Sequence, residues 1–210
     1  LKTNLFEKFQ YRNLANEDVF YNENIKGLLR NYQGAFYSLA QYYGREKMFD
    51  EMTGVLDKLT NIMPDTVIPM RKDLQFEIGR MYYIAGNHEK FKDTLLRLMS
   101  RNDVALDEKL QYAGWFSQLY PESAEQAVVV VEKLRNEYPN RADSYYWLAS
   151  HYMRSQKYQA GIDVLNQWLA RNPNDQNAIS QVQQLKNLMV ESQKDTVAVP
   201  DTTMTDSLQN

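Results

Sequence analysis

The chain has 210 residues and a formal net charge of −3 at pH 7, so it lacks the basic excess of most nucleic-acid-binding proteins. Hydrophobic residues make up 43% of it, enough for a packed core, and 15 Tyr against 8 Gly and 6 Pro favour a helical body over a disordered chain. The absence of Cys excludes disulfides and thiolate metal sites. The longest purely apolar run, Ala127–Val131, is much shorter than the roughly 20 residues that a membrane span needs.

The first 32 residues have the least regular pattern. Apolar clusters around Phe6–Tyr11 and Val19–Tyr21 alternate with Asn-rich polar stretches. We predict an irregular segment that packs its aromatic rings against the first helices. A long helix is then predicted over Glu23–Tyr43, with Asn22 or Asn24 as its N-cap, because apolar residues recur there at helical spacing.

The clearest pattern is a helix–turn–helix unit over Ala142–Asp175. Leu148 and Tyr152 belong to an apolar stripe with the spacing of one helical face. Ser155–Lys157 is long enough only for a tight turn, and a second apolar stripe follows before Pro173, which predicts the end of the second helix. The unit spans 34 residues, which is the period of the tetratricopeptide repeat.

The residue types at these positions resemble the tetratricopeptide pattern, apart from Trp168, which stands where a small residue is usual and predicts altered packing. In another unit Phe91 also stands at a small-residue position, which predicts that its two helices splay apart. The β-branched run Val128–Val131 is predicted as helix because its flanks and the repeat register favour one. The resemblance implies an all-α, right-handed superhelical array of about four helix pairs, over 33–66, 72–105, 108–141 and 142–175, with a capping helix over 176–192 and a flexible tail over 193–210.

The sequence offers no set of residues for catalysis. His88 and His151 are the only histidines, no His-x-x-x-His pair exists, and the glycines are too widely spaced for a phosphate-binding loop. Neighbouring acidic residues occur where helix starts and solvated faces need them. We therefore predict no catalytic residue, no cofactor and no metal.

A partner-binding groove is the remaining functional prediction. In tetratricopeptide arrays the first helices of successive units line a concave surface that binds peptides or partner proteins. The first helix of the third unit, Asp107–Leu119, is shifted in register by one residue, and no groove residue is predicted from it. A groove-like register also arises from packing alone, so both interpretations stay open. The predicted groove residues are Tyr37, Gln41, Arg45, Asp73, Phe76, Arg80, Tyr83, Asp143, Tyr146, Ser150 and Arg154.

Several short motifs in the N-terminal third carry a narrower resemblance. They are Phe9–Leu14, Val19–Asn24, Asn31–Gln33, Phe36 and Leu39–Ala40. Together they resemble the soluble C-terminal region of a bacterial membrane-protein family related to protein O-mannosyltransferases. Members are multi-span proteins, similar to glycosyltransferases, that use lipid-linked sugars and carry a helical-repeat domain outside the cytoplasm.

This resemblance covers roughly Phe6–Pro69 and implies a periplasmic protein-interaction domain. The membrane part with its catalytic carboxylate would then lie upstream of Leu1, and no catalytic residue carries over to this chain. A chain that begins with Leu also suggests an excised segment of a longer protein. The alternatives are a free-standing tetratricopeptide scaffold of cell-envelope assembly and an enzyme in its own right, which would need a polar pocket with perturbed titratable groups.

Overall fold

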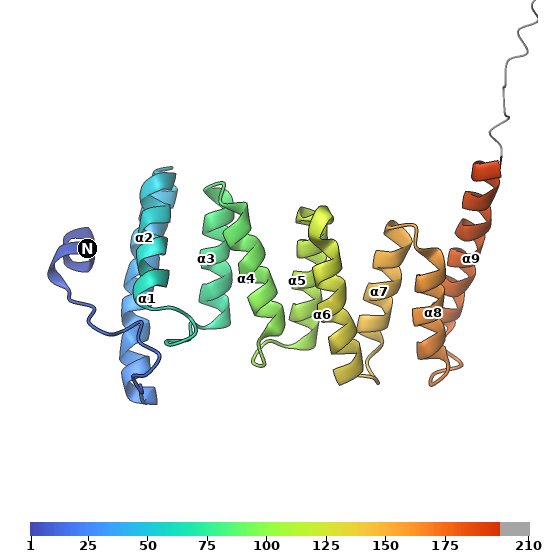
Figure 1. Ribbon diagram of the computed structural model, residues 1–210, viewed down its shortest axis with the longest axis horizontal. Helices are drawn as coiled ribbons and strands as arrows, with labels where there is room; N and C mark the ends of the chain where they lie inside the picture. Colours follow the sequence, from blue (N-terminus) through green and yellow to red (C-terminus); the bar gives the residue numbers. More distant parts are fainter. Residues whose placement is uncertain (198–210) are drawn as a thin grey trace, which may run out of the picture. The chain divides into compact units, whose positions relative to one another are not determined.

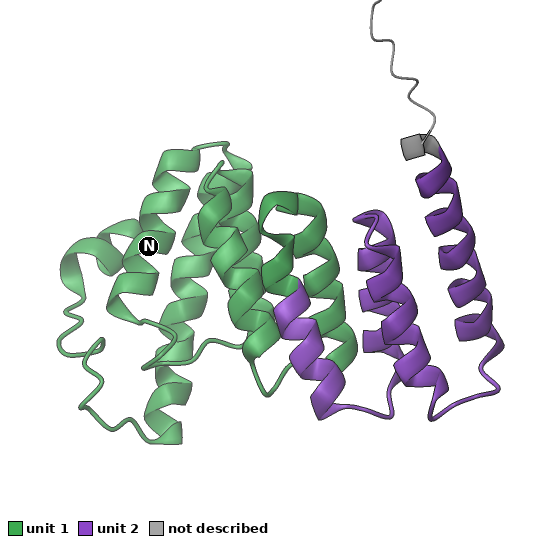
Figure 2. Ribbon diagram, turned by 45° about the vertical axis from the view of Figure 1, so that its right-hand side comes forward, with its two compact units in different colours: residues 1–127 green, residues 128–210 purple. Residues whose placement is uncertain are grey.

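A computed structural model describes residues 1–197, with side chains up to Lys194, and every regular element in this part of the chain is helical (Figure 1). The predicted all-α class is therefore confirmed. The chain divides into two compact units, Leu1–Ala127 (unit 1) and Val128–Asn210 (unit 2), shown in separate colours in Figure 2.

Each unit is built from helices that pack on their neighbours in sequence. In unit 1 these pairs are α1 with α2, α2 with α3, α3 with α4, and α4 with α5, and in unit 2 they are α7 with α8 and α8 with α9. The division between the units falls inside α6. The elements are a π-helical turn at Asn4–Lys8, α1 (Glu23–Arg45), α2 (Phe49–Ile62), α3 (Lys72–Ile84), α4 (His88–Ser100), α5 (Leu106–Leu119), a 3₁₀ turn at Pro121–Ser123, α6 (Ala124–Glu137), α7 (Ala142–Arg154), α8 (Tyr158–Leu169) and α9 (Gln176–Val197).

The turns of three helix pairs share one hydrogen-bond pattern. In each, a tyrosine carbonyl near the end of the first helix accepts a bond from the backbone amide five residues later, at 2.8 to 2.9 Å. The residue before that amide has a positive φ, as in the turns that commonly end helices. The carbonyls belong to Tyr43, Tyr82 and Tyr152, and the positive-φ residues are Lys47 (58°), Gly86 (83°) and Gln156 (56°). The three turns therefore close in the same way, each with an amide five residues after a tyrosine of the preceding helix.

The ends of the helices agree with most of the sequence signals. The Asn22 side chain accepts a bond from the Ile25 amide at 2.9 Å and caps α1, as predicted. The β-branched run Val128–Val131 lies inside α6, which confirms the helix predicted there. The last helix needs a correction, because α9 continues to Val197 through the start of the predicted tail. Residues 198–210 lie outside the described part of the chain.

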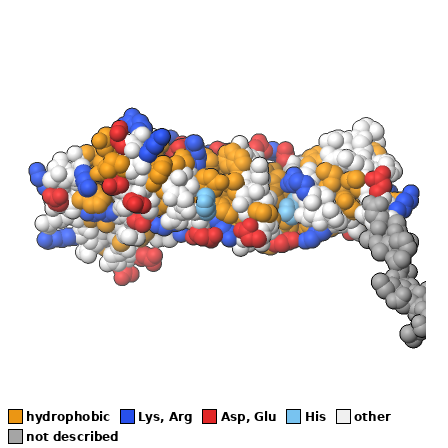
Figure 3. Space-filling model, turned by 90° about the horizontal axis from the view of Figure 1, so that it is seen from above, with side chains coloured by type: hydrophobic (Ala, Val, Ile, Leu, Met, Phe, Trp, Pro, Cys, Tyr) orange, Lys and Arg blue, Asp and Glu red, His pale blue; other side chains and the backbone are white. Residues whose placement is uncertain are grey.

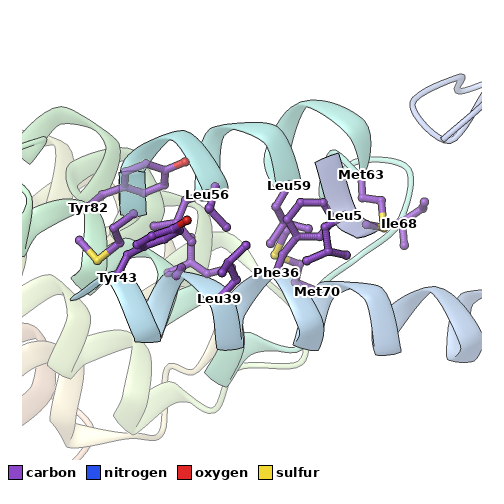
Figure 4. Packing of buried hydrophobic residues seen from close by; sticks show 14 of the residues in the cluster. Leu5, Phe36, Leu39, Tyr43, Leu56, Leu59, Met63, Ile68, Met70 and Tyr82 are labelled. Carbon is purple, nitrogen blue, oxygen red and sulfur yellow. The ribbon is translucent and has the colours of Figure 1, made fainter. Parts of the chain in front are cut away.

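The N-terminal segment packs on α1 and α2, as predicted. Leu5 is fully buried, and it lies near Phe36 and Ile68 in the core of unit 1 (Figure 4). The Phe6 ring lies 6.3 Å from that of Phe36. Lys58 of α2 donates a hydrogen bond to the Phe6 carbonyl at 3.1 Å, and its ammonium stands 4.2 Å from the centre of the Phe6 ring. These contacts cover apolar surface of α1 and α2 that would otherwise face water.

The α3–α4 pair contradicts the predicted splaying at Phe91. A Cβ atom built on Gly79 of α3 would lie 2.7 Å from Thr94 Cγ2 and 3.0 Å from Phe91 Cδ2 of α4. The helix backbones therefore approach closely at this point. The large Phe91 ring fits because Gly79 has no side chain, so a small residue on one helix compensates for a large residue on the other.

Candidate interaction surface

Three aromatic side chains from α3 and α5 form a contiguous cluster, called the aromatic face below. Phe76 stacks on Trp115, with ring centres 5.2 Å apart and planes 19° apart, and the Tyr112 ring lies 5.3 Å from Phe76. Tyr112 is buried, whereas Phe76 and Trp115 are half-buried and keep part of their surface in solvent. The aromatic face therefore consists of a buried ring and two rings whose remaining apolar surface is accessible to a partner.

Ion pairs border the aromatic face. Lys72 of α3 pairs with Glu108 of α5, and the Glu108 carboxylate also accepts a bond from the Ala105 amide at 3.1 Å. The hydrogen bond from Lys72 and then that from the Ala105 amide lower the pKa of Glu108. The same Glu108 bond raises the pKa of Lys72. Both groups therefore stay charged at neutral pH and link α3 to α5 beside the rings.

Three of the predicted groove residues, Tyr37, Gln41 and Arg80, lie close together in unit 1. The pKa of Tyr37 is raised, first by burial and then by the carboxylate of Glu77 on α3, while hydrogen bonding with Gln41 opposes the shift. Glu77 forms an ion pair with Arg80 at 2.9 Å. Tyr37, Gln41 and Arg80 thus share one side of unit 1. Arg45, at the end of α1, is exposed.

Two other predicted residues of unit 1 have local partners. The Asp73 carboxylate pairs with Arg71 at 3.0 Å, just before α3. The Tyr83 ring is half-buried and packs against His88, 4.6 Å away, and Phe91, 5.4 Å away. Tyr83 therefore belongs largely to the contact between α3 and α4.

In unit 2, predicted groove residues also serve the fold. Tyr146 donates a hydrogen bond at 2.8 Å to Asp175, which also accepts one from the Trp168 ring at 2.8 Å and caps the start of α9 through two backbone amides. Burial and then the Asp175 bond raise the pKa of Tyr146 to about 12. The ring N–H of Trp168, the residue for which altered packing is predicted, thus bonds to Asp175 beyond the end of α8. Asp143 pairs with Arg141 at 2.8 Å.

Of the remaining predicted residues of unit 2, Ser150 is half-buried and Arg154 is exposed at the end of α7. The structure thus brings three of the predicted residues, Tyr37, Gln41 and Arg80, together within unit 1. In unit 2 it ties Tyr146 and Asp143 to partners of their own unit.

Sequence reasoning missed Tyr112 and Trp115, which complete the aromatic face. Both lie in α5, where the repeat register was shifted and no groove residue was predicted. The available signal was the pair of large aromatic residues three positions apart, which places them on one side of a helix.

A cleft of about 830 Å³ lies on the other side of α3. Its lining includes Gln75, Ile78 and Tyr82 of α3, together with residues of α2, of α4 and of the segment after α2. At about 100° per residue, these three positions lie on nearly the opposite face of α3 from Phe76 and Arg80. The groove predicted from the sequence lies on the first helices and does not include this cleft.

Several other polar groups of the described chain serve the fold. Tyr82 donates to Asp57 at 2.7 Å, and burial, followed by this bond, raises the pKa of Tyr82 well above its usual range. The His88 carbonyl accepts a bond from the Tyr120 hydroxyl, and the buried His151 ring stacks on Trp147 with planes 5° apart. Residues 1–197 hold no group of three or more His, Asp or Glu side chains arranged to bind a metal ion.

Two general findings concern membranes and charge. No helix in the described part of the chain has both the length and the apolar character needed to cross a lipid bilayer. On the face that Figure 3 displays, Lys and Arg side chains are interspersed with Asp and Glu. That face shows no concentrated basic stripe of the kind that nucleic-acid binding uses.

Comparison with known proteins gave no match: no family model fits the sequence, and neither the curated proteins nor the solved structures searched include a similar chain.

Proposed function

We propose that this chain is a non-catalytic protein-interaction domain that binds a partner protein or peptide through the aromatic face of unit 1. The observation that carries the proposal is the half-buried stack of Phe76 on Trp115, which packs against the buried Tyr112. Rigid aromatic side chains provide large contact areas at low entropic cost and are enriched where binding energy is concentrated. The proposed architecture around this surface is a tetratricopeptide-like superhelix.

The charges beside the aromatic face support the same proposal. Lys72 and Glu108 neutralise each other, as do Arg80 and Glu77. A partner can bury the rings without leaving an isolated charge in the contact, which would cost binding energy. The titration shifts beside the aromatic face have ordinary causes, namely burial of tyrosines and pairing of charges. An enzyme in its own right would need a functional pair of perturbed groups in a polar pocket.

To test this proposal, peptides that bind the full chain are selected from a displayed random library. Their affinity is then measured for the full chain and for single variants. Trp115→Ala should weaken binding at least tenfold, because truncating a central aromatic residue of an interface commonly costs about 2 kcal/mol or more. Tyr138→Ala is the matched control, since Tyr138 is an exposed aromatic residue of unit 2. Selected peptides that bind wild type and Trp115→Ala equally would refute the aromatic face as the binding surface.

The resemblance over Phe6–Pro69 extends the proposal: we place the chain outside the cytoplasm, in the periplasm, as the C-terminal part of a membrane protein similar to glycosyltransferases. The alternative is a free-standing scaffold of cell-envelope assembly. The full reading frame distinguishes them, because many apolar spans of about 20 residues upstream support the first. A lipoprotein signal with its Cys supports the second. Fusions to a periplasm-active reporter enzyme test the compartment in either case.

A further inference from the structure

We propose that the cleft between α2 and α4 is a second binding site, which takes a short extended peptide carrying a basic and an acidic residue two positions apart. The floor is formed by Ile78 and Tyr82 of α3, and Met70 contributes further apolar surface. Its volume of about 830 Å³ lies in the range of ligand-binding clefts, roughly 300 to 1,000 Å³. This site is separate from the aromatic face.

The length of the cleft fits an extended peptide. The lining residues of α4 run from Lys90 to Ser100, which corresponds to about 15 Å at roughly 1.5 Å per helical residue. An extended chain rises about 3.3 Å per residue, so about five peptide residues would fit along this wall.

The hydrogen-bonding groups of the cleft call for a ligand with both donors and acceptors. Thr60, Thr94 and Ser100 line the cleft, and their hydroxyls donate to carbonyls of their own helices at 2.7 to 3.1 Å, so each oxygen keeps a lone pair that can accept a bond. Asn61 and Arg97, which also line the cleft, can donate. Hydroxyls whose protons are already engaged favour a ligand that brings its own donors, and a peptide backbone supplies N–H donors and carbonyl acceptors in alternation.

Most charges in the cleft are already neutralised. Lys90 is paired with Asp57, and Arg101 is held by Asp103 at 2.8 Å and by Asp65 at 3.6 Å. Arg101 also donates to Gln75, which leaves it little capacity for a ligand. These paired groups form part of the cleft walls and would contribute little to ligand specificity.

Asp93 and Arg97 are the two exceptions. Both line the cleft, and within residues 1–197 neither forms an ion pair. They lie one helical turn apart on α4, a rise of about 6 Å. Residues i and i+2 of an extended peptide are about 6.6 Å apart and point to the same side. A basic side chain beside Asp93 and an acidic one beside Arg97 therefore match this spacing.

The first test uses acetylated and amidated heptapeptides of Ala and Leu that carry one Lys and one Glu two positions apart, in both orders. They are titrated into the isotopically labelled full chain, and amide chemical shifts are recorded. We expect shifts at Thr94, Arg97 and Ser100 with one or both orders, and at least threefold weaker binding when Lys and Glu are adjacent, because adjacent side chains point to opposite sides. No shift at these amides at about 5 mM peptide, where millimolar affinity would be visible, overturns the proposal. Equal binding of spaced and adjacent charges also overturns it.

Variants then test the residues. Asp93→Asn and Arg97→Gln should each weaken binding of the spaced peptide about three- to fivefold, in keeping with a single exposed ion pair. Ser100→Trp, at an exposed position on the cleft wall, should abolish it by filling the cleft. Lys133→Gln on α6, outside the cleft, is the control and should bind as wild type does. Unchanged affinity in both charge variants would overturn the proposal. Trp115→Ala should leave this binding intact, so failure of the cleft and failure of the aromatic face are distinguishable.

Discussion

Replacing Gly79 by Ala tests the close approach of α3 and α4, on which both proposed surfaces depend. The added Cβ would lie 2.7 Å from Thr94 Cγ2 and 2.9 Å from Thr94 Cβ. Carbon atoms make favourable contact at about 3.5 to 4.0 Å, so the helices would have to separate locally by about 1 Å. A rotation of the Thr94 side chain cannot relieve the clash, because its Cβ is fixed to the backbone.

The expected loss of stability follows from two opposing contributions. Overpacking of a tight contact costs about 1 to 3 kcal/mol. Alanine in a helix interior is more favourable than glycine by about 1 kcal/mol, which offsets part of that cost. Because the clash involves an atom next to the backbone, the upper part of the overpacking range applies. We expect Gly79→Ala to lower the free energy of unfolding by about 1 to 2 kcal/mol.

Gly54 in α2 is the matched control, since a Cβ there would meet no atom within 4 Å. Gly54→Ala should raise the free energy of unfolding by about 0.5 to 1 kcal/mol. The measurement is urea unfolding of both variants and wild type, followed by far-ultraviolet circular dichroism. If Gly79→Ala were as stable as Gly54→Ala, the close approach and its compensation for Phe91 would be wrong.

Three further predictions concern buried and charged groups. Gln33 is fully buried and donates to the Ile68 carbonyl at 3.1 Å, so Gln33→Glu should destabilise the chain by about 2 to 4 kcal/mol at neutral pH. Burial would raise the pKa of the introduced carboxyl in the folded chain. The lost stability should therefore return on acidification: it is fully restored below the pKa of the unfolded chain and lost again as the pH rises through the pKa of the folded chain. A loss that does not depend on pH would contradict this. Hydrogen bonds, first that from Trp168, lower the pKa of Asp175. Asp175→Asn should therefore reduce the thermal midpoint of unfolding at pH 6. The difference from wild type should shrink as the pH falls through the lowered pKa of Asp175. Lys58→Met should make the first 22 residues more sensitive to limited proteolysis than wild type, with cleavage elsewhere unchanged.

Local signals account for the parts of the fold that the sequence predicts well. The cap at Asn22, the turn at Ser155–Lys157 and the helical course of Val128–Val131 each depend on residues within one or two helical turns. The recurrent tyrosine near the end of the first helices also depends on local sequence, since its carbonyl accepts a bond from an amide only five residues later. Periodicity and capping chemistry are sufficient at that range.

Contacts between distant positions explain what the sequence did not predict. The splaying expected at Phe91 fails because the compensating Gly79 lies on the preceding helix. Tyr146 looked like a groove residue, and only the position of Asp175, 29 residues later, shows that its hydroxyl is engaged. Trp115 was not predicted because the groove positions were assigned by repeat register, and that register is shifted by one residue in the helix that carries Trp115.

The two proposed surfaces share α3, and the contact at Gly79 lies between them on that helix. The cleft uses Ile78 and Tyr82, the aromatic face uses Phe76, and the glycine fixes how far α3 stands from α4. A separation of about 1 Å would misplace groups on both sides at once, since close-packed interiors transmit such strain. Gly79→Ala should therefore weaken binding of both the selected peptides and the spaced-charge peptides, although residue 79 contacts neither ligand. Weakening of one without the other would show that the two faces of α3 are positioned independently.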